Sequence, residues 1–98
     1  MSYPIIRTTV GCTQYMIDIG EKAISDSYSK YKFDEKLNIF NACNDIKNTF
    51  VEKFGGKWSV AIYNEKYGNS TIDANNYLKY TFKEYEIKIF KTSASKEN

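Results

Sequence analysis

The chain has 98 residues, with 14 basic and 12 acidic side chains, a formal net charge of +2 and no histidine. This length suits a single domain, which buries only about two-thirds of the surface that its unfolded chain exposes. Without histidine, histidine-based triads and general acid–base schemes are excluded, and two cysteines alone do not form a common zinc site. We therefore expect no cofactor, and we expect a partner subunit to supply stability.

Targeting signals are not evident. The first residues lack the charged and apolar regions of a signal peptide, and no apolar run approaches the roughly 18–20 residues of a membrane span. Basic and acidic residues are interleaved, whereas a nucleic-acid-binding domain concentrates its basic residues on one stripe. We expect a cytoplasmic protein with no membrane partner, in which Cys12 and Cys43 are free thiols in a reducing compartment.

The first part of the chain predicts a strand and a helix. Residues 3–10 are rich in β-branched side chains and carry Pro4 near their start, which is typical of an edge strand or an ordered arm. A helix is predicted over about 13–29, with Thr13 as its N-cap. Gly20 in its interior either weakens the helix or allows close packing against a neighbouring helix. The apolar positions recur at three- and four-residue steps: Met16, Ile17, Gly20, Ala23, Ile24 and Tyr28.

A second helix is predicted from an N-cap at Asp34 to Gly55, a residue suited to the left-handed conformation that ends helices. Cys43 lies in its apolar stripe, and we interpret it as a small buried hydrophobic residue rather than a reactive thiol. The stripe has the strongest helical periodicity of the chain: Leu37, Ile39, Phe40, Cys43, Ile46, Phe50 and Phe54.

After Gly56 the hydrophobic period changes from about 3.6 to about 2, which predicts strands. They cover about 58–63, 70–73, 77–82 and 85–90, and turn residues separate them. Helices followed by strands indicate an α+β fold, with two helices packed on an antiparallel sheet whose strands pair as a meander. The alternation leaves one sheet face semi-polar, suited to solvent or to a partner: Tyr77, Lys79, Thr81, Glu86 and Lys88.

We expect one domain over residues 1–98, and no catalytic site within it. Its parts are an N-terminal strand or arm over 1–12, a helical pair over 13–55, strands over 57–91 and a polar tail over 92–98. No glycine-rich phosphate loop is present, and the acidic residues are dispersed. The hydroxyl residues of the strands have no histidine to activate them. The sequence therefore indicates a protein that is not an enzyme.

Several segments in a fixed order resemble a dynein light chain of the small hub type. They begin with 50–58, an aromatic-ended helix followed by a tryptophan that opens a strand. The opening segment 3–7 is similar to the first strand of divergent, axonemal-type members. The remaining matches are Val60-Ala61-Ile62, Tyr67-Gly68, Tyr77-Leu78-Lys79-Tyr80 and Ile87-Lys88-Ile89-Phe90-Lys91.

The resemblance implies a strand-swapped dimer that catalyses no reaction. The strand near 69–74 would cross to the sheet of another copy or of a related light chain, and a partner chain would add an extended segment to it, which is β-augmentation. Two bound partner segments would gain affinity through bivalency. The implied partner-binding residues are Glu35, Lys36, Gly68, Asn69, Ser70, Thr71, Ile72, Asp73, Tyr77, Lys79 and Thr81. The implied dimer-interface residues are Trp58, Ser59 and Ile72.

The sequence departs from the family pattern at positions that matter for binding. Typical members carry a Thr-His pair in the swapped strand, which grips a glutamine-containing ligand, but here Ile72 and Asp73 stand there. Ser59 replaces a histidine that typical members place after the strand-opening tryptophan. Lys79 and Thr81 dilute the aromatic groove floor. We therefore hypothesise a divergent member with a dedicated partner.

The leading functional hypothesis is a non-catalytic light chain of a dynein motor complex on microtubules, with the axonemal outer arm of a cilium as the preferred location. Its partners would be dynein intermediate or heavy chains, and neither nucleic acid nor membrane. One alternative is a general cytoplasmic dimerisation hub. An alternative from a different class is a small single-stranded nucleic-acid-binding domain, which would use tyrosines together with Lys57, Lys79, Lys83, Lys88 and Lys91.

Overall fold

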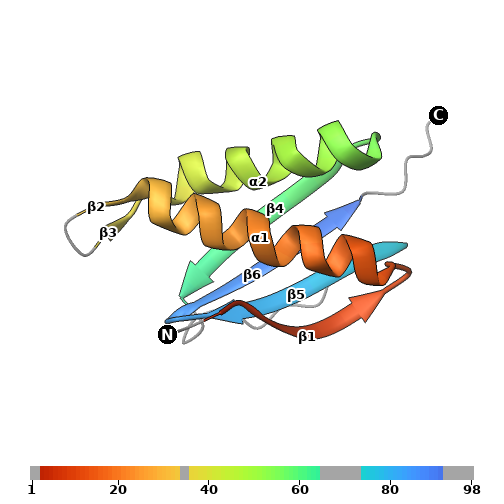
Figure 1. The fold of residues 1–98 in the computed structure, drawn as a ribbon, viewed down its shortest axis with the longest axis horizontal. Coiled ribbons are helices and arrows are strands. Elements are labelled where there is room, and N and C mark those ends of the chain that lie inside the picture. The colour runs from red at the N-terminus through yellow and green to blue at the C-terminus, as the bar shows by residue number, and fades with distance from the viewer. Residues whose placement is uncertain (1–2, 34–35, 65–73, 92–98) are drawn as a thin grey trace.

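The computed structural model describes residues 3–33, 36–64 and 74–91. Two helices lie on one face of a four-stranded antiparallel sheet (Figure 1), so the predicted α+β fold is confirmed. The described elements, in chain order, are β1 (Ile5–Val10), α1 (Gln14–Tyr31), β2 (Lys32–Phe33), β3 (Lys36–Leu37), α2 (Ile39–Phe54), β4 (Trp58–Asn64), β5 (Asn76–Phe82) and β6 (Tyr85–Lys91).

The strand order is β1-β5-β6-β4, so the predicted meander is wrong. Among the described strands of this four-stranded sheet, only β5 and β6 are both consecutive and paired, and they are joined through Lys83, which has a left-handed φ of 56°. β4 pairs with β6 rather than with β5, and β1 takes the free side of β5. As a result, β1 and β4 form the two edges of the sheet.

The helix ends follow local capping. The Thr13 side chain accepts a hydrogen bond of 3.2 Å from the N–H of Met16, which confirms the predicted N-cap. The second helix begins later than predicted, because β2 and β3 pair as a short hairpin and Asn38 caps α2 instead. The predicted cap Asp34 lies outside the described residues. Gly55 ends α2 with a φ of +69°, as predicted.

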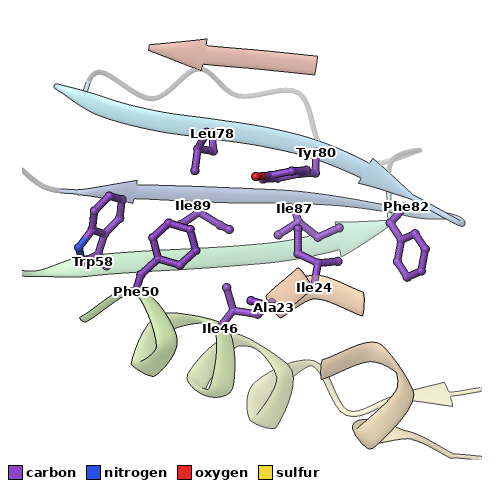
Figure 2. Packing of buried hydrophobic residues seen from close by; sticks show 10 residues of the cluster. All are labelled: Ala23, Ile24, Ile46, Phe50, Trp58, Leu78, Tyr80, Phe82, Ile87 and Ile89. Carbon is purple, nitrogen blue, oxygen red and sulfur yellow. The ribbon is translucent and has the colours of Figure 1, made fainter. Parts of the chain in front are cut away.

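The core lies between the helices and the sheet, and Figure 2 shows side chains from both layers pointing toward one another. Phe50 of α2 packs against Trp58 of β4, with ring centroids 4.9 Å apart. The indole N–H of Trp58 donates to the carbonyl oxygen of Gly55 over 2.9 Å, which ties the end of α2 to the sheet. The buried cluster comprises Ala23, Ile24, Ile46, Phe50, Trp58, Leu78, Tyr80, Phe82, Ile87 and Ile89.

Two sequence predictions about packing need correction. Gly20 is buried and tightly packed, but its neighbour is Tyr80 of the sheet and not the second helix. Phe40 was predicted in the buried stripe of α2, yet it is 74% exposed. The reason is that Phe40 lies about a third of a turn away from the buried Ile46 around the helix. Within the described ranges, neither helix is long and apolar enough to cross a membrane.

Candidate strand-docking edge

The β1 edge carries features that discourage pairing with a further strand. Pro4 precedes β1, and the pairing with β5 shifts register between Ile6 and Thr8. At this irregularity the charged Arg7 donates from Nε to the hydroxyl of Thr81 over 2.8 Å. Proline, a bulge and a charged side chain are the usual protections of an exposed edge. β1 is therefore a poor site for strand addition.

The β4 edge has none of these protections. Trp58–Asn64 contains no proline and no charged residue, and its register with β6 is continuous over all seven residues. No strand in the described parts of the chain pairs with the other side of β4. Backbone N–H and C=O groups of residues 58–63 on that side are therefore arranged to pair with an added strand.

Helix α2 flanks this edge, because it packs over β4 whereas α1 covers the middle of the sheet (Figure 1). The Cys43 thiol of α2 lies against the backbone of Ile62 in β4. Burial raises the pKa of this thiol above its ordinary value, and the contact with Ile62 opposes the shift. Cys43 thus joins the helix to the edge strand as a neutral, half-buried group, close to its sequence interpretation.

The sheet face opposite the helices holds a charged cluster. Register places Lys88 of β6 beside Lys79 of β5, with Glu86 next on the same face. The Nζ atoms of both lysines lie 3.8 Å from Oε2 of Glu86, and the Tyr63 hydroxyl donates to that oxygen over 2.7 Å. Lys88 is only 1% exposed. This face was predicted to be semi-polar, and its centre is buried rather than solvated.

Tyrosine hydroxyls on this face stay protonated. Burial raises the pKa of Tyr63, and its hydrogen bond to the Glu86 carboxylate and the charge of that carboxylate raise it further. Burial also raises the pKa of Tyr77, with a smaller contribution from Glu86. Both phenols therefore remain neutral, and that of Tyr63 serves as a donor to Glu86 at neutral pH.

A second candidate site is a cavity of about 140 Å³ between α1 and α2. Three of its charged groups are engaged locally, since Lys22 and Asp26 form an ion pair of 2.9 Å and Asp45 accepts from the buried hydroxyl of Ser27. In the described ranges, no three metal-ligating side chains cluster. The lining residues are Ile19, Lys22, Ala23, Asp26, Asp45, Thr49 and Lys53.

The predicted site residues fall in different places. Lys36 lies in β3 rather than at the start of a helix. Trp58 lies in the core of its own subunit, and Ser59 is half-buried on β4. Three residues predicted as the groove floor lie on β5, which β1 and β6 flank: Tyr77, Lys79 and Thr81. The others lie outside the described residues: Glu35, Gly68, Asn69, Ser70, Thr71, Ile72 and Asp73.

Sequence reasoning missed the exposed apolar residues of α2. Ile39, Phe40 and Val51 are 38%, 74% and 38% exposed. Periodicity placed Ile39 and Phe40 in the apolar stripe, but Ile39 is the first residue of the helix and Phe40 lies about a third of a turn away from the buried Ile46. Exposed apolar residues at helical spacing beside an edge strand mark a candidate interaction surface. We call the open side of β4, together with Phe40, Lys47 and Val51, the β4–α2 surface.

Comparison with solved structures identifies the fold. The dynein light chain-like domain of the Fasciola hepatica calcium binding protein FhCaBP2 superposes with a TM-score of 0.69 at 17% identity, covering 93% of each chain. The dynein light chain-like domain of CsTAL3 gives a TM-score of 0.71 at 15% identity, covering 93% of this chain and 94% of that one. No protein-family model and no curated protein matches the sequence. The chain therefore has the dynein light chain-like fold.

Proposed function

We propose that this chain is a non-catalytic light chain of a dynein motor complex, which binds extended segments of intermediate or heavy chains by strand addition. The observation that carries the proposal is the contrast between the two sheet edges. β1 is protected by a proline, a bulge and a charge, whereas β4 presents seven uncharged residues without interruption. The dynein light chain-like fold supports the same conclusion.

Strand addition explains how an uncharged edge binds a partner selectively. In this proposal the open side of β4 receives the strand near 69–74 of the second subunit, and the partner segment adds to that strand: main-chain hydrogen bonds supply affinity, and alternate side chains of the added segment supply specificity. Pairing with a second copy or with a related light chain holds two partner segments together, and the second binding event then becomes intramolecular. In this proposal the strand near 69–74 is exchanged between subunits, and the complex acts on microtubules, preferably in the axonemal outer arm.

A single-stranded nucleic-acid-binding function has weaker support, because the lysines that it requires do not share one surface. Lys83 lies in the turn between β5 and β6, while Lys91 lies at the far end of the same hairpin. Lys88 is almost fully buried. A steep salt dependence of binding to single-stranded RNA would favour that function over the proposed one.

Affinity capture from the native source tests the proposal. The tagged wild-type chain should recover dynein heavy and intermediate chains, identified by mass spectrometry. Ser59→Lys places a charge on the β4 edge and should abolish recovery, whereas the matched Thr9→Lys change on the exposed β1 edge should preserve it. Recovery of other proteins without dynein chains would favour the general hub, and equal loss with both variants would contradict β4 docking.

A further inference from the structure

The cavity between α1 and α2 is large enough for a small molecule. Its volume is about 140 Å³, compared with about 10–15 Å³ for a cavity that holds a single water. Small side chains leave this space open, because Ala23 lines it from α1 and Thr49 lines it from α2. On the other side of α2, Cys43 contacts Ile62 of the docking edge. Helix α2 therefore separates the cavity from the edge used in the proposed function, and a ligand can occupy it with or without strand addition.

The two helices run antiparallel along the cavity (Figure 1). Asp45 of α2 accepts a hydrogen bond of 3.0 Å from Ser27, near the end of α1. At the opposite end, the ring centroids of Tyr15 and Phe54 lie 5.8 Å apart. Lys53 lies two turns after Asp45 on α2, which is about 12 Å along the helix axis. The cavity therefore has an acidic group toward one end and a basic group toward the other.

Asp45 and Lys53 belong to no ion pair in the described parts of the chain. The other two charged groups of the cavity, Lys22 and Asp26, neutralise each other through an ion pair of 2.9 Å. The Oδ2 atom of Asp45 is held by the hydroxyl of Ser27, a residue that is 1% exposed. Among the described residues, no side chain donates to its Oδ1 atom. Two opposite charges therefore line one cavity without neutralising each other.

We propose that this cavity binds a small zwitterion, with an amino group and a carboxylate at the two ends of an apolar chain. The amino group donates to the carboxylate of Asp45, and the carboxylate of the ligand accepts from the ammonium of Lys53. The apolar chain lies against Ile19 and Ala23, which line the cavity between these ends. A simple anion or cation fits less well, because two lysines and two aspartates line the cavity and repel either ion as much as they attract it.

The spacing of the two charges selects the length of the ligand. Side chains on a helix lean toward its N-terminus, so the stem of Lys53 leans toward Asp45. The stem shortens the separation of about 12 Å between the two positions but does not close it, since the two groups form no ion pair. An α-amino acid, whose charged groups flank one carbon, is too short to reach both. A chain of about five carbons between the charged groups spans the remaining distance.

Titration of the isotopically labelled full chain with ε-aminocaproate, followed through amide chemical shifts, measures binding to the wild type. We expect saturable shifts in α1 and α2 and a dissociation constant on the order of 1 mM, as suits a ligand of about nine non-hydrogen atoms. Hexanoate lacks the amino group, hexylamine lacks the carboxylate, and free glycine has a shorter chain. Each of these three controls should bind at least about tenfold more weakly.

Variants on α2 test the assigned residues. Asp45→Asn keeps an acceptor for Ser27 but removes the charge, and Lys53→Gln removes the opposite charge, so each should weaken ε-aminocaproate about tenfold. Lys47→Gln removes an exposed charge on the other side of α2 and should leave binding unchanged. Thr49→Leu fills the cavity without changing its charge and should abolish binding. Urea denaturation establishes that each variant is folded.

Two sets of results would overturn the proposal. The first is the absence of saturable shifts around the cavity, or binding of hexanoate, hexylamine or glycine as tight as that of ε-aminocaproate. The second is unchanged affinity in both Asp45→Asn and Lys53→Gln, or an equal loss of affinity in Lys47→Gln. The ligand series on the wild type decides the question even where a variant does not fold. None of these results bears on strand addition at β4.

Discussion

Gly20 of α1 and Tyr80 of β5 lie in direct contact, and a Cβ atom on Gly20 would overlap the Tyr80 hydroxyl group. That hydroxyl donates a hydrogen bond of 2.6 Å to the carbonyl oxygen of Ile17, one turn earlier in the helix. Because Gly20 has no side chain, Tyr80 of the sheet can reach the backbone of α1. This contact fixes how closely α1 packs on the sheet.

Replacing Gly20 with alanine should destabilise the fold although alanine favours helix. The gain in helix propensity is about 1 kcal/mol, but overpacking of a closed core costs typically about 1–3 kcal/mol and displaces Tyr80. Urea denaturation of Gly20→Ala, Tyr80→Phe and the double variant measures the coupling free energy between the two positions. A coupling energy below about 0.5 kcal/mol would show that the two residues act independently.

Phe50 and Phe40 provide a matched pair on one helix. Phe50→Ala should lower the free energy of unfolding by about 3–5 kcal/mol, because the side chain is fully buried against Trp58. Phe40→Ala should change it by less than about 0.5 kcal/mol, because the side chain is exposed. Thermal and urea denaturation of both variants check this. Equal losses would mean that Phe40 supports the fold and not a partner.

Alkaline pH should weaken the fold through buried tyrosines. Burial raises the pKa of Tyr80 above its ordinary value of 10.0, and nearby acidic groups, Glu21 first, add to the shift. Above about pH 10 the unfolded chain loses phenolic protons that the folded chain retains, so the free energy of unfolding falls as pH rises and is unaffected below. Denaturation of wild type and Tyr80→Phe at about pH 8 and pH 11 measures this. If the free energy of unfolding falls equally in both proteins, Tyr80 is not the cause of the pH dependence.

The two thiols should react slowly in the native chain. Burial raises the pKa of both Cys12 and Cys43, and hydrogen bonds to neighbouring groups oppose the shift only in part. Modification by Ellman's reagent at about pH 8 should therefore be faster after denaturation for both. Binding of a strand at β4 should slow the reaction of Cys43 further and leave Cys12 unchanged. Protection of Cys12 instead would place the ligand near β1.

Local signals predicted much of the fold. Thr13 capped the first helix and Gly55 ended the second, because each needs only its own neighbours in sequence. The β5–β6 hairpin also followed from alternation around a two-residue link. Two strand pairings were not predicted. Neither the pairing of β4 with β6 nor the β2–β3 hairpin, after which α2 begins, has a signal within a short window of sequence.

The candidate site was less predictable than the fold. The family resemblance directed attention to β-augmentation, but it placed the helix contribution at Glu35 and Lys36, before the helix that the structure shows. Exposure of Phe40 depends on which side of α2 packs against the sheet, and that is a tertiary feature. The weakness of β1 as an edge depends on a bulge at Arg7, which alternation did not reveal.

Amide hydrogen exchange of the chain bound to a dynein segment recovered by capture tests strand addition most directly. When a new strand pairs with one side of β4, every second backbone N–H of β4 becomes protected from exchange with solvent. We therefore expect slower exchange at alternate amides of β4 in the bound wild-type assembly than in Ser59→Lys, with β1 unchanged. Protection along β1, or bound segment without any change at β4, would contradict the proposed docking edge.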